Sequence, residues 1–221
     1  MSNNIDNIIF SKSKSNPTVD TYDALYNLEY YRTNEYLAPL ENFVPFIKNC
    51  ESLCRKSLYY KKYIHYIKEE VGLTACQVLG NVQEVDPSDN LIEMHHGPLL
   101  TLFDYCTIIT NYLLYNRYKF NEFTVAKMVM EEHYNNRVEV IMVCETVHDL
   151  LHSPGGPFVE LDQGFGDVYG FLKKYKNGLD SNLIYKINRY YDKSVNIGTQ
   201  DYKLFEINNF ANKMNDSFDF K

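Results

Sequence analysis

The sequence contains no stretch that is long and apolar enough to cross a membrane. A membrane helix needs about 20 mainly apolar residues in a row, and the longest apolar stretch, 98–114, is interrupted repeatedly by polar residues such as Asp104. Residues 1–20 are polar and lack the apolar segment behind a basic start that marks a secretory leader. We therefore expect a soluble protein of the cytoplasm that has no membrane partner.

Paired cysteines at metal-binding spacing are also missing. The chain has five cysteines, an odd number, and only Cys50 and Cys54 lie close together in the sequence. Without a second close pair, a zinc site built from cysteines is not indicated. An odd set of thiols without a secretory leader is typical of reduced cysteines inside a cell.

An excess of positive charge is missing too, because 29 acidic and 22 basic side chains give a net charge of -7. This balance argues against a protein that coats nucleic acid unspecifically, although it does not exclude a local basic groove. The chain has no P-loop and no G-x-S-x-G motif, and Gly164, Gly166 and Gly170 lack the spacing of a dinucleotide-binding loop.

The hydrophobic pattern that is present predicts an α+β fold. A chain of 221 residues, 45% of them hydrophobic, can bury a core of its own. Apolar residues recur at helical spacing over 20–36, 41–71, 99–115 and 121–134. Strand-like runs lie at 74–79, 91–96, 137–144 and 158–161. We expect a flexible arm (1–19), a helical region (20–72), a core with a helical insertion (73–176, insertion 99–134) and a C-terminal helical or tail region (177–221).

The histidines carry the strongest functional signal, since five of the six lie between residues 95 and 152. His148 and His152 are four residues apart on a predicted short helix, which places both imidazoles on one helical face. Neighbouring residues on a strand point to opposite sides, so His95 can supply a third nitrogen while His96 faces elsewhere. Glu93 shares the strand face of His95. Three nitrogen ligands with an open position predict a catalytic rather than a closed metal site.

Each of these features has an ordinary explanation when it is taken alone. An H-x3-H pair arises by chance on helices, and a His-His pair is often a surface or turn feature. His133 is interpreted as a residue at a helix end that interacts with the last carbonyl groups. The combined pattern favours a metal site, because an E-x-H-H strand and a strand that runs directly into an H-x3-H helix occur together.

Glu93-Met94-His95-His96, followed by the segment 143–148 and His152, resembles the HNH or ββα-metal nuclease motif. The order of the histidines is closest to the colicin-type DNase branch, and the flanking sequence is similar to bacteriophage-encoded HNH proteins. The resemblance covers roughly residues 74–170. Val147 stands where many members have a second cysteine, 51 residues separate His96 from His148, and the asparagine of the motif is unassigned.

The resemblance implies an HNH endonuclease that hydrolyses DNA phosphodiester bonds. His95, His148 and His152 would hold one divalent ion (Mg, Mn, Ni or Zn), His96 would act as the general base, and Glu93 would be a supporting acid paired with Arg137. An all-histidine set by itself favours Zn, Ni or Co over Mg. The DNA partner would be held by basic residues: Arg137, Lys61, Lys62, Lys173 and Lys174.

Three further interpretations stay open. The basic residues of 55–68 lie among tyrosines, which suits contact with nucleic acid, although a solvated helix face with the tyrosines packed inward is the favoured interpretation for most of them. The whole protein can be a non-catalytic phage structural or regulatory protein that binds a structural metal and a phage or host protein partner. A metal-dependent hydrolase of other phosphoesters is the third alternative. The position of His96 relative to the ion distinguishes catalysis from a structural site.

Overall fold

The computed structural model describes residues 31–83, 91–199 and 201–218. The predicted arm (1–19) and most of the predicted helix 20–36 lie outside these residues. None of the helices within the described ranges is long and apolar enough to span a bilayer.

The described residues form a mostly helical fold around a two-stranded antiparallel sheet, which fits the predicted α+β class. The elements are α2 (Asn34–Leu37), α3 (Leu40–Lys56), α4 (Leu58–Glu69), β1 (Ile92–His96), α5 (Leu102–Tyr115), α6 (Glu122–Tyr134), β2 (Val140–Cys144), α7 (Glu145–His152), the 3-10 helices η2 (Leu161–Gln163) and η3 (Lys176–Gly178), α8 (Val168–Lys174), α9 (Ser181–Ile197) and α10 (Tyr202–Phe218). This arrangement of helices and strands fits the α+β class but does not show the predicted HNH core.

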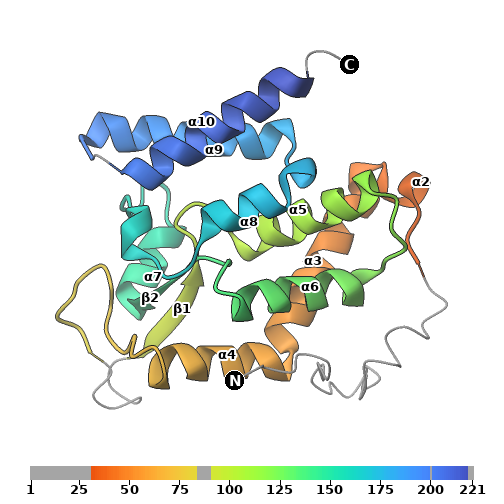
Figure 1. Ribbon diagram of the computed structural model, residues 1–221. Coiled ribbons are helices and arrows are strands. Elements are labelled where there is room, and N and C mark those ends of the chain that lie inside the picture. The colour runs from red at the N-terminus through yellow and green to blue at the C-terminus, as the bar shows by residue number, and fades with distance from the viewer. Residues whose placement is uncertain (1–30, 84–90, 200, 219–221) are drawn as a thin grey trace.

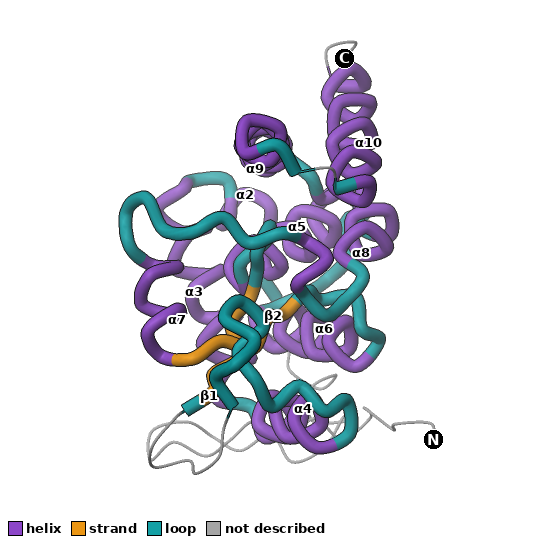
Figure 2. The backbone as a smooth tube through the Cα atoms, turned by 90° about the vertical axis from the view of Figure 1, so that its left-hand side faces the viewer, coloured by secondary structure: helices purple, strands orange, loops and turns teal. Residues whose placement is uncertain are grey.

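The helices form layers around the sheet (Figure 1). α9 and α10 lie side by side at the top of the view, α4 lies along the bottom, and α3, α5 and α6 lie between them. Figure 2 shows β1 and β2 between α7 and α6. One hydrophobic core extends through these layers, from Leu37 in α2 to Ala211 in α10.

The long apolar pattern over 41–71 becomes two helices because Ser57 interrupts it. Ser57 has an extended backbone conformation, and its hydroxyl accepts a hydrogen bond from the backbone N–H of Tyr60 at 3.0 Å. A serine that caps the next helix in this way stabilises a new helical start rather than a continuous helix. The chain therefore turns at residue 57, and α4 lies beneath the sheet region.

β1 and β2 pair antiparallel, with His95 opposite Ile141 and His96 opposite Val140. The predicted strands 91–96 and 137–144 are thus confirmed in their central parts, with α5 and α6 inserted between them as expected. Each of these two helices begins with a capping box, at Thr101 and Asn121 respectively, which fixes its start point.

The predicted strands at 74–79 and 158–161 are wrong. Residue 75 makes only an isolated bridge to Gln83, and the second segment runs into η2. The free edge of β2 is instead covered by single residues: Gln77 exchanges hydrogen bonds with the Met142 backbone at 2.7 and 2.8 Å, and Phe165 pairs with Val140. Because these contacts satisfy the edge, a third strand is not needed there.

Tyr105 connects α5 to the start of β2. Its ring is fully buried and stands edge-on to Phe171, with ring centroids 4.7 Å apart, and its hydroxyl accepts the backbone N–H of Glu139 at 2.9 Å. We expect a Tyr105→Phe variant to lose about 1–3 kcal/mol of unfolding free energy, because a buried donor loses its acceptor. Urea denaturation measures this loss. The exposed Tyr185→Phe variant is the control, and an equal loss in both variants would contradict the prediction.

Candidate metal centre

Two adjacent elements bring the histidines together. β1 presents Glu93 and His95 on one face, and β2 ends at Cys144, where α7 begins without a loop. α7 begins at Glu145, and its N-cap residue, Cys144, makes no side-chain capping bond. The direct passage from strand to helix places α7 against β1.

His95, His148 and His152 form a group that could hold a metal ion. One ring nitrogen from each residue lies within 4.8 Å of the others, and the Nε2 atoms of His148 and His152 are 3.3 Å apart. Ligand nitrogens about 2.0–2.1 Å from a tetrahedral zinc ion are roughly 3.3–3.4 Å from one another. The His148–His152 pair already has this separation, and the ligand nitrogen of His95 lies within 4.8 Å of both.

Glu93 supports the second of these ligands. Its Oε2 lies 3.1 Å from Nδ1 of His148, so Nδ1 carries the hydrogen and the lone pair of Nε2 is available to an ion. A carboxylate behind a histidine ligand fixes the tautomer and orientation of the ring in many metal sites. The expected pairing of Glu93 with Arg137 is not found, because Glu93 faces His148 and Arg137 binds Glu132.

His95 has two features that suit a metal ligand. Its Nδ1 is buried and has no hydrogen-bond partner among the described residues, and a buried polar atom of this kind requires a partner. Burial, followed by the neighbouring His152 and His148, lowers the pKa of His95 to about 4. The ring is therefore neutral at neutral pH, which is the form that binds metal ions.

His96 points away from this group, into the core on the other side of the sheet. Its Nε2 lies 3.0 Å from Nε2 of His133, and its ring stacks on Tyr60. His133 must donate from Nδ1 to the Val129 carbonyl at 2.8 Å, so its Nε2 accepts a hydrogen bond from His96. The structure thus does not bring His96 together with the three candidate ligands.

The His96–His133 pair is a feature that the sequence analysis missed. His133 lies in the last turn of α6 but is fully buried, and the carbonyl that it contacts lies one turn earlier in the same helix. The alternation along β1 already placed His96 on the opposite face. The partner on that face comes from a different helix, and no local pattern identifies it.

The buried pair predicts a loss of stability in acid. Burial lowers the pKa of His133 to about 4, and the bond to Val129 opposes this shift only in part. The unfolded chain, with a histidine pKa near 6.5, then takes up the proton first, so stability is lost as pH falls. Between pH 7 and pH 5 the stability advantage of the wild type over a His133→Gln variant should shrink by about 2 kcal/mol. Urea denaturation at both pH values tests this, with the exposed His65→Gln as control; an unchanged advantage would contradict it.

The basic residues expected to bind DNA mostly have partners within the protein. Arg137 and Lys174 both donate to the buried carboxylate of Glu132. Lys173 lies over the Tyr169 ring at 4.1 Å and Lys62 over the Tyr59 ring at 5.4 Å. Lys61 is exposed on α4. Four of the five residues thus have a partner within the protein, and their contact with DNA stays a prediction.

A family model for Bacteriophage G278-like virion proteins matches residues 1–217. The chain belongs to this virion protein family. No curated protein and no solved structure shows a significant match to it.

Membership in the virion protein family corrects the main functional prediction. The family model covers nearly the whole chain and is not a model of HNH endonucleases, so the identification as an HNH endonuclease is wrong, and with it the predicted DNA-hydrolysing activity. The histidine motif misled because His95, His148 and His152 do lie together, which is the geometry that nucleases also use. The bacteriophage origin, predicted from the same region, is confirmed.

Proposed function

We propose that the protein is a non-catalytic structural component of the phage particle, in which a divalent ion bound by His95, His148 and His152 fastens β1 to α7. The observation that carries the proposal is the three-histidine group supported by Glu93, in a chain whose family consists of virion proteins. Its partners would be other phage proteins of the particle, and its destination would be the virion rather than the host cytoplasm.

A metal ion at this position would have a clear mechanical effect. β1 and α7 are separated in the sequence by the two helices α5 and α6, and the sheet that joins them has only two short strands. A two-stranded sheet is weak by itself. An ion that binds both elements adds its binding free energy to the stability of the folded state, because the unfolded chain does not form the site.

The chemistry of the ligands favours zinc. Three imidazoles suit zinc, copper, nickel or cobalt better than magnesium, which prefers oxygen. His96 contacts His133 and is not a fourth ligand, so the structural role is supported by the virion protein family rather than by this histidine. The fourth coordination position is therefore left for a water molecule or an external ligand.

Zinc binding to chelator-stripped protein tests the metal site. Calorimetric titration should show one zinc per chain. At a free zinc concentration 1,000 times the Kd, the unfolding free energy should rise by about 4 kcal/mol. A His148→Ala variant should bind at least 100-fold more weakly, and Glu93→Gln about 10- to 100-fold more weakly. His65→Ala, an exposed histidine on α4, should bind as the wild type does. Equal zinc binding by the wild type and His148→Ala would contradict the metal site.

The virion role has its own test. Purified phage particles should contain the chain in a fixed ratio to the other virion proteins, measured by quantitative mass spectrometry. Particles that lack the chain altogether would contradict the proposed role, whatever the outcome of the zinc titration.

A further inference from the structure

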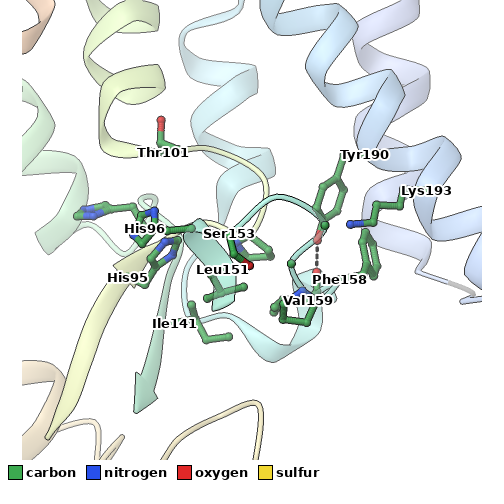
Figure 3. A pocket seen from close by; sticks show the side chains of 15 residues that line it. His95, His96, Thr101, Ile141, Leu151, Ser153, Phe158, Val159, Tyr190 and Lys193 are labelled. Carbon is green, nitrogen blue, oxygen red and sulfur yellow. Dashed lines mark hydrogen bonds between the residues drawn. The ribbon is translucent and has the colours of Figure 1, made fainter. Parts of the chain in front are cut away.

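A pocket of about 400 Å³ borders the three-histidine group. It is formed by the end of α7, the segment 153–159 that follows it, and one side of α9. Figure 3 shows His95 at one end of the pocket and Lys193 at the other. Because His95 and His152 both line the pocket, an ion held by the histidines would have its open coordination position beside this space.

The wall between these two ends is largely apolar. Ile141 and Val159 are buried, and Leu151 and Phe158 are partly buried against the pocket. Tyr190 of α9 donates a hydrogen bond from its hydroxyl to the Val159 carbonyl, which ties the segment 153–159 to α9 and leaves the tyrosine ring as part of the wall. A pocket with an apolar wall and few polar groups is the usual form of a small-ligand site.

The polar groups of the pocket favour a singly charged anion. Its lining contains no acidic side chain, and its one cation, Lys193, is exposed and has no ion-pair partner among the residues that the structure describes. The hydroxyls of Thr101 and Ser153 already donate, to Asp104 and to the Leu150 carbonyl. A phosphate would need several donors, and neither of these hydroxyls is free to donate. A carboxylate needs fewer and is an ordinary zinc ligand.

From this geometry we infer that the pocket binds a carboxylate attached to an apolar group: the carboxylate takes the fourth position on the ion held by His95, His148 and His152, and the apolar group lies against Leu151, Phe158 and Val159. The inference rests on the proposed metal site. The carboxylate belongs either to a separate small molecule or to an acidic side chain of a second copy of this chain.

Cobalt(II) bound to the full chain provides the readout, because its visible absorption changes when the fourth ligand changes. 3-Phenylpropionate, acetate and inorganic phosphate would each be titrated into the cobalt protein. 3-Phenylpropionate should bind roughly tenfold or more tightly than acetate, because its phenyl group is removed from water, and phosphate should bind no better than acetate. If cobalt itself does not bind, the proposed metal site fails. If cobalt binds but 3-phenylpropionate has no advantage over acetate or phosphate, only the present inference is overturned.

Variants of the wall test where the ligand lies. Phe158→Ala should weaken 3-phenylpropionate binding and leave acetate binding unchanged, whereas Phe205→Ala, an exposed phenylalanine of α10, should change neither. Lys193→Met, a substitution on the surface that cannot disturb the core, should weaken both carboxylates by about two- to fivefold. Equal affinities in the wild type and both pocket variants would overturn the inference.

Sedimentation of the same samples distinguishes the two sources of the carboxylate. A cobalt-dependent dimer that 3-phenylpropionate dissociates assigns the carboxylate to a second copy of the chain. A monomer that binds 3-phenylpropionate with the expected preference assigns it to a separate molecule.

Discussion

Between pH 5 and pH 8.5 the wild-type protein is expected to lose about 3–4 kcal/mol more unfolding free energy than a Glu139→Gln variant. Glu139 lies immediately before β2, donates its backbone N–H to the Tyr105 hydroxyl, and is only 1% exposed. Its Oε2 has no hydrogen-bond partner among the described residues. Burial raises the pKa of Glu139 to about 8, and the Leu99 backbone N–H opposes this shift only in part.

The sign follows from the two states of the chain. In the unfolded chain the carboxyl group has an ordinary pKa and loses its proton near pH 4.5, whereas in the folded protein it keeps the proton until about pH 8. The stabilisation from the bound proton is therefore fully present in acid and is lost as pH rises towards 8. A glutamine has the shape of the protonated acid and does not titrate, so the variant lacks this loss.

Urea denaturation at pH 5, 7 and 8.5 measures the effect, and Glu145→Gln, an exposed acid at the start of α7, is the matched control. The control should follow the wild type at each pH. A Glu139→Gln variant whose stability changes with pH as the wild type's does would show that the carboxylate is ionised in the folded protein. The histidine effect described above has the opposite sign below pH 6.5, and comparison with matched variants separates the two.

The candidate metal ligands were predictable because their signals are local. Helical spacing of four residues places His148 and His152 on one face, and strand alternation places Glu93 and His95 together. The strand-to-helix junction at Cys144 then needs only the pairing of β1 with β2 to bring the two groups into contact. Helical spacing and strand alternation therefore predict most of the candidate site from the sequence alone.

The function was not predictable from the same residues. Three imidazoles and a supporting carboxylate specify the binding of an ion, and a nuclease and a structural protein can use the same set. The family membership corrects the nuclease prediction, and the features that no local pattern indicates are tertiary: His96 lies against His133, and the pocket wall comes from α9, about forty residues after α7. The same holds for the strand-like run at 74–79, where the contact of Gln77 with Met142 replaces a strand.

Replacing Glu132 with leucine should cost about 2–3 kcal/mol of unfolding free energy, because it removes a buried acceptor that three donors share. The carboxylate is 1% exposed and accepts hydrogen bonds from Arg137, from Lys174 at 2.6 Å and from the Tyr175 hydroxyl at 2.8 Å. Burial alone would raise the pKa of Glu132, but these three donors outweigh it and lower the pKa. The leucine variant would leave the buried Tyr175 hydroxyl and two cations without their acceptor.

Glu131→Gln is the matched control, since this neighbouring glutamate is partly exposed and its carboxylate lies 3.6 Å from the Lys127 ammonium, farther than the donors of Glu132. It should cost no more than about 0.5 kcal/mol. Lys174→Met should also cost much less than Glu132→Leu, because the lysine is half exposed and its loss leaves the carboxylate paired with Arg137 and Tyr175. Equal losses in Glu132→Leu and Lys174→Met would mean that the ion pair alone, and not the buried acceptor, carries the stability. The expected order instead assigns Lys174 to holding α8 against the end of α6 and Arg137 to fixing the chain just after α6, which are structural roles at residues where the sequence suggested contact with DNA.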